Sequence, residues 1–394
     1  MTNTEWKEYT VQELIDLDML EPPLDGNHGE KHPKSTDYVS EGIPFVMAND
    51  LTNGSVDLKN CYFITQEQAD SLDKGFAKPG DVLLTHKATL GRTAIVPDTY
   101  PMIVLTPQVT YYRCKKGIHN KYLKYYFDSP SFQQLFQNWA GSGSTRLYLG
   151  ITAQRKLPIV LPPLAEQQRI AKILSSLDEK IELNNAINRN LEEQAQAIFK
   201  SWFIDFEPFG GEMPEDWAIG KLSDIADITM GQSPDGKSYN ENGDGVVFYQ
   251  GRAEFGWRFP TRRLFTAAPS RMAKKYDTLM SVRAPVGDLN IANEDCCIGR
   301  GLAAIHSKNN HQSFVHYTII ALKPKLDMYN GEGTVFGCIN RDSLSNMEVI
   351  IPCKQDLDKF ESLISILDAE IFNYSEENHR LNILRNDLLR NLLE

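Results

Sequence analysis

The chain has 394 residues, of which 41% are hydrophobic and 24% are charged, a globular composition at a length that predicts two or three folded units. It contains no run of eighteen apolar residues, no secretory signal and no Cys-x-x-Cys pair, so we expect a cytoplasmic, soluble protein without a membrane span or a disulfide framework. The formal net charge of -11, taken alone, argues against a nucleic-acid partner, because proteins of that class usually neutralise phosphates with lysine and arginine.

Residues 1–160 have the pattern of a mixed α/β domain. Residues 101–112 are rich in β-branched and aromatic side chains and indicate strands, whereas 119–139 have a helical pattern. Charge is uneven within this domain: residues 1–60 hold 4 Lys and Arg against 12 Asp and Glu, while 61–160 hold 12 against 6. The second stretch is therefore locally basic, although the whole chain is acidic.

Residues 161–206 are predicted to form one long helix. Its core positions alternate in steps of four and three, which is the heptad seam of a coiled coil. A helix of roughly 38 residues would be about 57 Å long, and so narrow an apolar stripe needs a partner helix. The seam positions are Ile170, Leu174, Leu177, Ile181, Asn184, Asn188, Leu191, Ala195, Ile198 and Trp202.

Residues 207–351 are predicted to form a second mixed domain, after a boundary at 205–217 that is rich in Gly and Pro. Within it, residues 252–283 carry 8 Lys and Arg against 2 Asp and Glu, interleaved with aromatic residues. Such a stretch can form a local surface for phosphates and bases, and it can equally be a solvated charged face.

Residues 352–394 repeat the long helix, with seam positions Phe360, Ile364, Leu367, Ile371, Tyr374, Asn378, Leu381, Arg385, Leu388 and Leu392. The other copy is its obvious partner. Antiparallel pairing brings the polar seam positions 184, 188, 374 and 378 together, and a buried Asn commonly fixes register at some cost in stability. Parallel pairing aligns them too, but a doubled unit favours a two-fold arrangement. The alternative is that these polar residues are solvated where the seam opens.

The chain is an internal duplication. Residues 173–181 and 363–371 share Ser, Leu, Asp and Ile at the same places, 190 positions apart. Residues 81–91 match 277–287 at an offset of 196, which makes Lys87 and Arg283 equivalent. The C-terminal part of each copy, which includes the long helix, has kept its spacing, whereas the N-terminal parts of the two copies have diverged in length.

Three segments of the chain resemble the specificity subunit of type I restriction–modification enzymes: Pro162-Pro-Leu-Ala-Glu-Gln-Gln-Arg-Ile170, Ala197–Phe206 and Met213–Trp217. Gly80–Gly91 is similar to the target recognition domains of that family. The resemblance covers essentially the whole chain, in order and twice over. One departure is Pro352-Cys-Lys-Gln-Asp, which replaces the Pro-Leu-Ala-Glu-Gln pattern at the second helix start.

The resemblance implies an α+β fold with two tandem mixed α/β target recognition domains, at 1–160 and 207–351. Each is followed by a long spacer helix, at 161–206 and 352–394, and the helices pair as an antiparallel coiled coil with pseudo-two-fold symmetry. It also implies that each domain binds one half of a bipartite target in double-stranded DNA. The helices would set the spacing and dock two methyltransferase subunits, and motor-nuclease subunits would complete the complex.

No catalytic or metal site is expected in this chain, since it has no phosphate-binding loop, methyltransferase loop or nuclease cluster. The resemblance implies that S-adenosylmethionine, ATP and Mg are bound by the partner subunits. The alternative function is a coiled-coil adaptor that scaffolds protein partners without reading DNA.

The candidate DNA-contacting residues are the cations of the two basic stretches. Lys87 and Arg283 are the best candidates, because they occupy equivalent positions after a predicted strand. The full set is Lys87, Arg92, Lys115, Lys116 and Arg146 in the first domain, and Arg258, Arg262, Arg263, Lys274, Lys275, Arg283 and Arg300 in the second.

Overall fold

A computed structural model describes residues 6–141, 147–283, 285–330 and 337–393. The chain divides into two compact units, one formed by residues 1–182 with 379–394 and the other by 183–378. The two long helices, α6 (Leu164–Phe203) and α11 (Lys354–Leu393), contribute to both units. Within the described residues, no helix is long and apolar enough to cross a membrane.

Unit 1 contains two four-stranded sheets, with strand orders β2-β11-β8-β9 and β6-β3-β10-β7. In the second sheet β3 and β10 run parallel, whereas the other paired strands of both sheets are antiparallel. Two-stranded pairs β1-β12 and β4-β5 complete the unit. The strands are β1 (Lys7–Thr10), β2 (Leu24–Asp25), β3 (Ile43–Val46), β4 (Leu51–Thr52), β5 (Ser55–Val56), β6 (Tyr62–Ile64), β7 (Phe76–Ala77), β8 (Val82–Thr85), β9 (Thr93–Ile95), β10 (Ile103–Leu105), β11 (Val109–Tyr112) and β12 (Pro158–Leu161).

Most helices of unit 1 pack on the first of these sheets, whereas α2 (Gln66–Asp70) packs on the second. The stretch predicted as one helix over 119–139 is two, α3 (Asn120–Asp128) and α4 (Pro130–Gly141). Ser129 between them has extended backbone, because the ring of Pro130 disfavours the helical conformation of the residue before it. The short helices are α1 (Val11–Asp16), α2 (Gln66–Asp70) and α5 (Ile151–Gln154).

Unit 2 repeats this arrangement with its own strands. The sheet β14-β22-β19-β20 corresponds to β2-β11-β8-β9, and a five-stranded sheet β15-β17-β16-β21-β18 again contains one parallel pair, β16 with β21. The strands are β13 (Ala218–Lys221), β14 (Ala226–Met230), β15 (Tyr239–Asn240), β16 (Val246–Tyr249), β17 (Leu264–Thr266), β18 (Met272–Ala273), β19 (Thr278–Val282), β20 (Val286–Ile291), β21 (Cys296–Ile298), β22 (Leu302–Ser307) and β23 (Glu348–Ile351).

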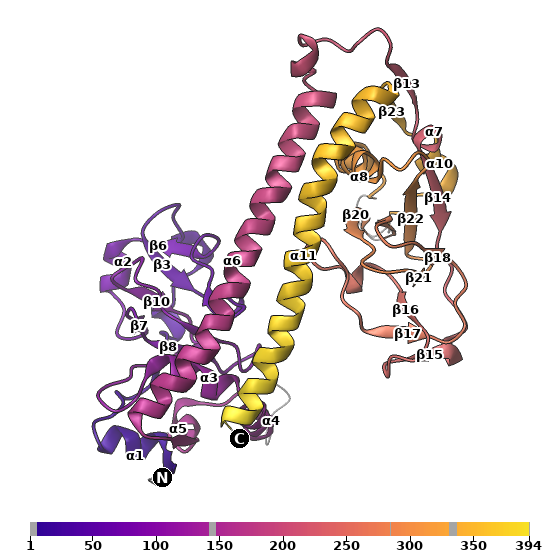
Figure 1. Cartoon of the computed structure of the whole chain (residues 1–394). Coiled ribbons are helices and arrows are strands. Elements are labelled where there is room, and N and C mark those ends of the chain that lie inside the picture. The colour runs from indigo at the N-terminus through magenta and orange to yellow at the C-terminus, as the bar shows by residue number, and fades with distance from the viewer. Residues whose placement is uncertain (1–5, 142–146, 284, 331–336, 394) are drawn as a thin grey trace. The chain divides into compact units, whose positions relative to one another are not determined.

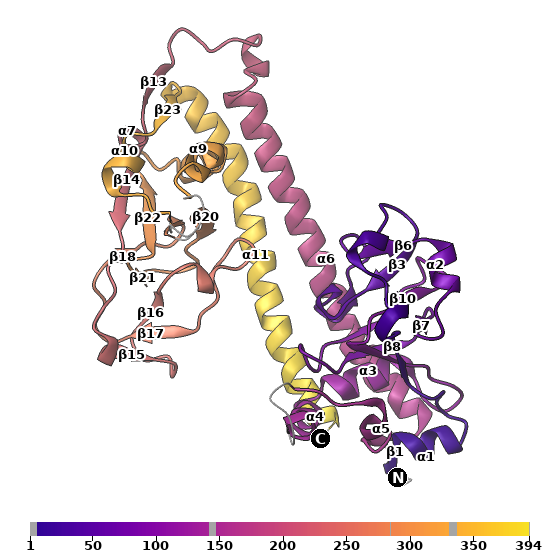
Figure 2. The ribbon, with the colours of Figure 1, turned by 180° about the vertical axis from the view of Figure 1, so that it is seen from behind.

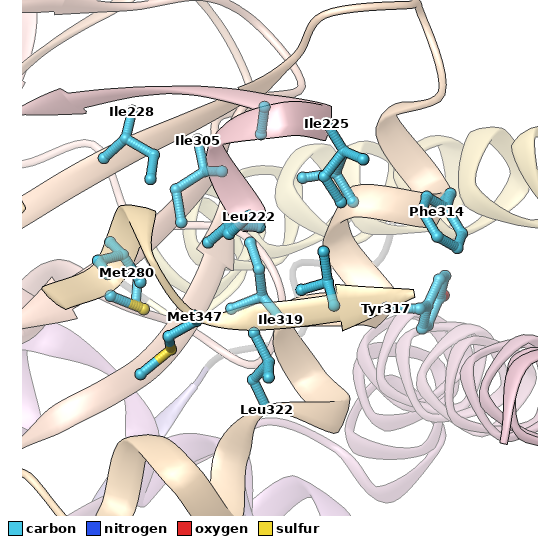
Figure 3. Packing of buried hydrophobic residues seen from close by; sticks show 14 of the residues in the cluster. Leu222, Ile225, Ile228, Met280, Ile305, Phe314, Tyr317, Ile319, Leu322 and Met347 are labelled. Atoms are coloured by element: carbon cyan, nitrogen blue, oxygen red, sulfur yellow. The ribbon is translucent and has the colours of Figure 1, made fainter. Parts of the chain in front are cut away.

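The core of unit 2 lies between its antiparallel sheet and its helices, α7 (Leu222–Ile225), α8 (Gln312–Ala321), α9 (Lys323–Asp327) and α10 (Arg341–Ser345). Figure 3 shows how side chains from these elements gather in it, among them Met280 and Ile305 from the sheet and Phe314 and Ile319 from α8. The same cluster includes Phe360 of α11, so the sheet domain and the long helices share one core.

In each unit, segments of α6 and α11 pack against each other with antiparallel register (Figure 1 and Figure 2). In unit 1, Ile170 and Leu174 share a core with Leu389 and Leu393. In unit 2, Phe199 of α6 lies with its ring centroid 5.9 Å from that of Phe360. The predicted fold class, two mixed domains each followed by a long helix, is confirmed.

The polar seam positions meet inside unit 2. Asn184 donates a hydrogen bond of 2.9 Å to Asn378, and Asn188 donates one of 3.2 Å to Ser375. Asn184, Asn188 and Asn378 are buried. Each of the twenty predicted seam residues is buried or half-buried. Each of the two compact units takes a segment of both long helices.

Candidate nucleic-acid interface

Lys87 and Arg283 occupy the same structural position in the two units. Each follows an inner strand of its antiparallel sheet, Lys87 two residues after the end of β8 and Arg283 directly after β19. Each forms a single antiparallel β-bridge, Lys87 with Tyr148 and Arg283 with Cys338. Both cations are exposed, and neither has an acidic partner among the described residues. The Lys87 ammonium also lies 5.9 Å from the centroid of the Tyr148 ring.

Several loops meet around Lys87, and we call this group, residues 26–32, 47, 86–92, 106–108 and 147–148, the Lys87 end. They meet because β8 ends where its antiparallel partner β11 begins, next to the end of β10. The amide of His86 donates to Gln108 over 2.9 Å, and that of Thr106 donates to Val46 over 3.0 Å. A pocket of about 310 Å³ opens here, lined by His28, Gly29, His32, Met47, Lys87, Thr106, Pro107 and Gln108.

Arg92 belongs to the Lys87 end. Its backbone is held by two hydrogen bonds of 2.9 Å to Thr85, which close the loop between β8 and β9. The side chain is exposed, and its guanidinium donates to the carbonyl of Leu51 over 3.3 Å. The structure therefore brings Lys87 and Arg92 together at one end of the sheet.

Two imidazoles beside Lys87, those of His86 and His32, are neutral near pH 7. Burial lowers the pKa of His86 to about 4, and burial also lowers the pKa of His32. His86 is fully buried, with Nδ1 lying 3.1 Å from the carbonyl of Leu149. The positive charge at this end therefore comes from lysine and arginine and not from these two histidines.

An equivalent group in unit 2, residues 231–233, 250, 283, 299–301 and 338, is called the Arg283 end. The amide of Val282 donates to Gly301 over 2.9 Å, and that of Gln232 donates to Ile298 over 3.0 Å, which draws the loops together. The backbones touch so closely that a Cβ on Gly231 would lie 2.2 Å from the Gly299 carbonyl oxygen. Arg300 is exposed in this group, so the structure brings Arg283 and Arg300 to one end of the sheet.

Lys115 and Lys116 do not join the Lys87 end. They follow β11, which runs antiparallel to β8, so the chain emerges at the opposite end of the sheet. The Lys115 ammonium lies 2.6 Å from Asp18, and the neighbouring Gly117 carbonyl accepts a hydrogen bond of 3.1 Å from Gln167 of α6. The structure therefore does not group these two lysines with Lys87. Arg146 lies outside the described residues.

Arg258 and Arg262 face the long helices. Arg258 is 5% exposed and its guanidinium forms ion pairs with Glu192 of α6 and Asp368 of α11, so the prediction of DNA contact is wrong for this residue. Arg262 pairs with Glu294 and lies 3.7 Å from Glu376 of α11. Its charge is therefore neutralised by neighbouring carboxylates.

The remaining candidates of unit 2 also lie away from the Arg283 end. Arg263 forms an ion pair of 2.5 Å with the buried Glu254. Lys274 and Lys275 are exposed, but they precede β19, whereas Arg283 follows it. The Lys275 ammonium lies 4.5 Å from the ring centroid of Phe372 on α11. These three cations are therefore not grouped with Arg283 and Arg300.

Sequence reasoning missed the residues that attach each domain to its long helices. Asp178 of α6 accepts a hydrogen bond from Tyr125, and Asp368 of α11 accepts one from Tyr317. The internal duplication could have identified these residues, because Asp178 and Asp368 are among the few side chains that recur between the two helices. Among the described residues, no group of three or more His, Cys, Asp or Glu is arranged to hold a metal ion.

Comparison with known proteins assigns the chain to a family. Residues 3–193 and 214–373 match the type I restriction modification DNA specificity domain, and the chain belongs to this family. A putative type I restriction enzyme MjaX specificity subunit from Methanocaldococcus jannaschii is 30% identical over 368 residues, covering 89% of this chain and 86% of the relative. The MjaIX specificity subunit of the same organism is 27% identical over 394 residues, covering 91% and 88%.

A solved structure supports the same fold. The S subunit of a type I restriction-modification system from M. genitalium covers 100% of this chain and 97% of its own, with a TM-score of 0.63 at 16% identity. The expected family is thus confirmed: the chain is a DNA specificity subunit, the non-catalytic member of a type I restriction–modification system. These comparisons do not favour the adaptor alternative.

Proposed function

We propose that each unit of this chain reads one half of a bipartite site in double-stranded DNA, with the Lys87 end in unit 1 and the Arg283 end in unit 2. The observation that carries this proposal is the pair of exposed cations at equivalent positions, Lys87 and Arg283, surrounded by loops that differ between the units. Lysine and arginine position a protein on phosphates, and arginine can also read guanine with two hydrogen bonds.

The differing loops account for two different half-sites. Beside Lys87 stands the sequence Thr106-Pro107-Gln108 with a pocket, whereas beside Arg283 stands Gly299-Arg300-Gly301. Specificity arises from contacts to base edges, and these contacts depend on loop side chains that project beyond a constant scaffold. Two scaffolds of one topology with different loops therefore suit an asymmetric target.

The proposed assembly includes two methyltransferase subunits docked on the long helices, with motor-nuclease subunits in the full complex. It would act in the cytoplasm. S-adenosylmethionine would bind the methyltransferase subunits, while ATP and Mg would bind the motor-nuclease subunits. Both helices expose acidic and basic side chains in similar numbers, a mixed surface that can pair with complementary charges on a protein partner.

The test is to co-express the chain with its methyltransferase subunit and to map methylated adenines across the host genome. A split motif with a fixed gap is expected. Replacing residues 1–160 by the corresponding segment of another family member should change one half of the motif only, and the matched replacement of 207–351 should change the other. An assembled complex with bound S-adenosylmethionine that yields no motif would contradict the proposal and favour the adaptor.

A further inference from the structure

One aspartate on each long helix receives a tyrosine hydroxyl from the neighbouring domain. In unit 1, Tyr125 of α3 donates to Asp178 over 2.6 Å. In unit 2, Tyr317 of α8 donates to Asp368 over 3.2 Å. Both tyrosines are nearly fully buried, and burial together with the carboxylate raises the pKa of each phenol, so each remains a hydrogen-bond donor. The same Tyr–Asp pair thus joins domain to helix twice in one chain.

Unit 2 adds a stronger connection through Arg258. The side chain comes from the loop before β17 and pairs with Glu192 of α6 and Asp368 of α11, and it donates to the Tyr317 hydroxyl over 3.2 Å. Ser313 at the start of α8 donates to the other oxygen of Asp368 over 2.6 Å. One domain arginine therefore contacts both long helices at once.

The start of α8 is also fixed to α11 within unit 2. The carboxylate of Glu361 accepts hydrogen bonds from the backbone amides of Ser313, over 3.0 Å, and Phe314, over 3.3 Å. An acidic group at a helix N-terminus satisfies amides that have no partner within the helix. These contacts set the direction of α8 against α11 as well as its position.

Unit 1 is held by fewer contacts from its domain. The guanidinium beside Asp178 belongs to Arg385 of α11, at 2.9 Å, so this ion pair joins helix to helix. From the domain, Tyr125 reaches Asp178, and the Lys124 ammonium lies 3.7 Å away. Lys121 adds an exposed ion pair with Glu179, and such pairs contribute little. The position equivalent to Arg385 in unit 2 is Ala195, where Arg258 supplies the charge instead.

Directional contacts of this kind can fix the orientation of a domain on its helices, which the apolar core alone cannot do. Apolar packing is largely non-directional, whereas hydrogen bonds and paired guanidinium groups weaken steeply when their geometry is disturbed. Buried ion pairs often add little net stability, and in some proteins they serve to select one arrangement among several. The Tyr–Asp pairs and Arg258 therefore restrict how a domain can turn on its helices.

Resting on the proposed function, we propose that Tyr125–Asp178 in unit 1 and Tyr317–Asp368 with Arg258 in unit 2 are positioning contacts that restrict the DNA gap to one length. A gap that differs by one base pair displaces a half-site by about 3.4 Å and rotates it by about 34° around the DNA axis. A domain that turns on its helices can follow that change, and these contacts oppose such a turn. Unit 2, with more contacts, is the more tightly restricted of the two.

The experiment compares the methylated motifs of complexes that carry variants of the full chain. Arg258→Met keeps an apolar stem and removes the charge. Tyr317→Phe keeps the ring and removes a single hydroxyl. Because this second change is small, it tests the proposal even if Arg258→Met folds poorly. We expect unchanged half-site sequences, and at least a tenfold rise in methylation at sites whose gap is one base pair longer or shorter. Arg258→Lys should allow less methylation at sites with an altered gap than Arg258→Met does. Tyr125→Phe should raise methylation at such sites less than Tyr317→Phe does.

The control is Glu370→Gln, which removes an exposed carboxylate two residues from Asp368 on the same helix. A complex that carries this variant should still methylate sites of one gap length only. A purely structural role predicts less methylation at the original motif with no new gap, and that result for both unit 2 variants would overturn the proposal. A wild-type complex without a bipartite motif would overturn the proposed function itself, and so the two failures are distinguishable.

Discussion

At the scale of single residues, an acidic partner identifies several of the candidate cations as structural. Lys87 and Arg283 are exposed without a described acidic partner, whereas Lys115 is paired with Asp18 and Arg258 with Glu192. A cation that is already neutralised within the protein gains less from a phosphate than an unpaired one does. Density of charge along the sequence could not make this distinction.

We therefore expect Lys87→Ala and Arg283→Ala each to weaken binding of the assembled complex to its own target by about tenfold or more. Loss of a phosphate contact should also reduce the slope of log K against log salt by about 1. Titration of the target duplex at several salt concentrations measures both. Lys115→Ala is the matched control and should bind as the wild type does; unchanged affinity of both variants would contradict the assignment.

His86 predicts how unit 1 responds to acid. Burial lowers its pKa from the ordinary 6.5 to about 4 in the folded chain. As pH falls from 6.5 to 4, His86 therefore binds a proton in the unfolded chain but not in the folded chain. Its contribution to stability is complete above pH 6.5, decreases through this interval and is constant below pH 4, with a span of about 3 kcal/mol at most.

Replacing His86 by Asn keeps a donor for the Leu149 carbonyl and removes the titrating ring. Urea unfolding followed between pH 4 and 7 should show a shallower loss of stability for His86→Asn than for the wild type. The exposed His379→Gln serves as the control and should follow the wild-type curve. Equal slopes for all three chains would show that His86 does not govern this pH dependence.

At the scale of elements, the long helices were predictable and the sheets were not. The heptad spacing depends on neighbours three and four residues apart, so it is visible in the sequence, and α6 and α11 lie within a few residues of the predicted ranges. The pairing of β3 with β10 joins segments about sixty residues apart, and no local pattern reports it. The antiparallel pairing of β8 with β11 likewise joins distant segments, and it places Lys115 at the opposite end of the sheet from Lys87, whereas the loop between β8 and β9 brings Arg92 to the Lys87 end.

The buried amides of the helix pair provide a prediction at this scale. Asn184→Leu removes the donor of the 2.9 Å hydrogen bond to Asn378, and leaving a buried polar group with one partner fewer costs about 1–3 kcal/mol. Replacing both residues by Leu removes donor and acceptor together, so the double variant should lose less stability than the sum of the two single variants. It still loses the hydrogen bonds from Asn184 to Glu377 and from Asn378 to Asn185, so it remains less stable than the wild type. Chemical denaturation of the four chains of this cycle gives the coupling energy; simple additivity would contradict a direct interaction.

At the scale of the whole molecule, the charge distribution explains how an acidic chain can be part of a DNA-binding complex. The net charge is -11, yet the exposed cations Lys87, Arg92, Arg283 and Arg300 lie at strand ends, and the long helices expose side chains of both signs. Average composition therefore misrepresents the local surface, and the argument against nucleic acid applied to the chain total only. It also implies that most phosphate contacts of the complex come from other subunits.

This division of charge predicts different salt dependences for the chain and for its complex. With about four phosphate contacts, the isolated chain should show a slope of about -3 to -4 in a plot of log K against log salt, and weak affinity because its net charge of -11 repels DNA. The complex with methyltransferase subunits should have a distinctly steeper slope. Fluorescence anisotropy with one labelled duplex measures both slopes under the same conditions. Equal slopes would mean that the chain itself makes nearly all the phosphate contacts, and that cations beyond the Lys87 and Arg283 ends take part.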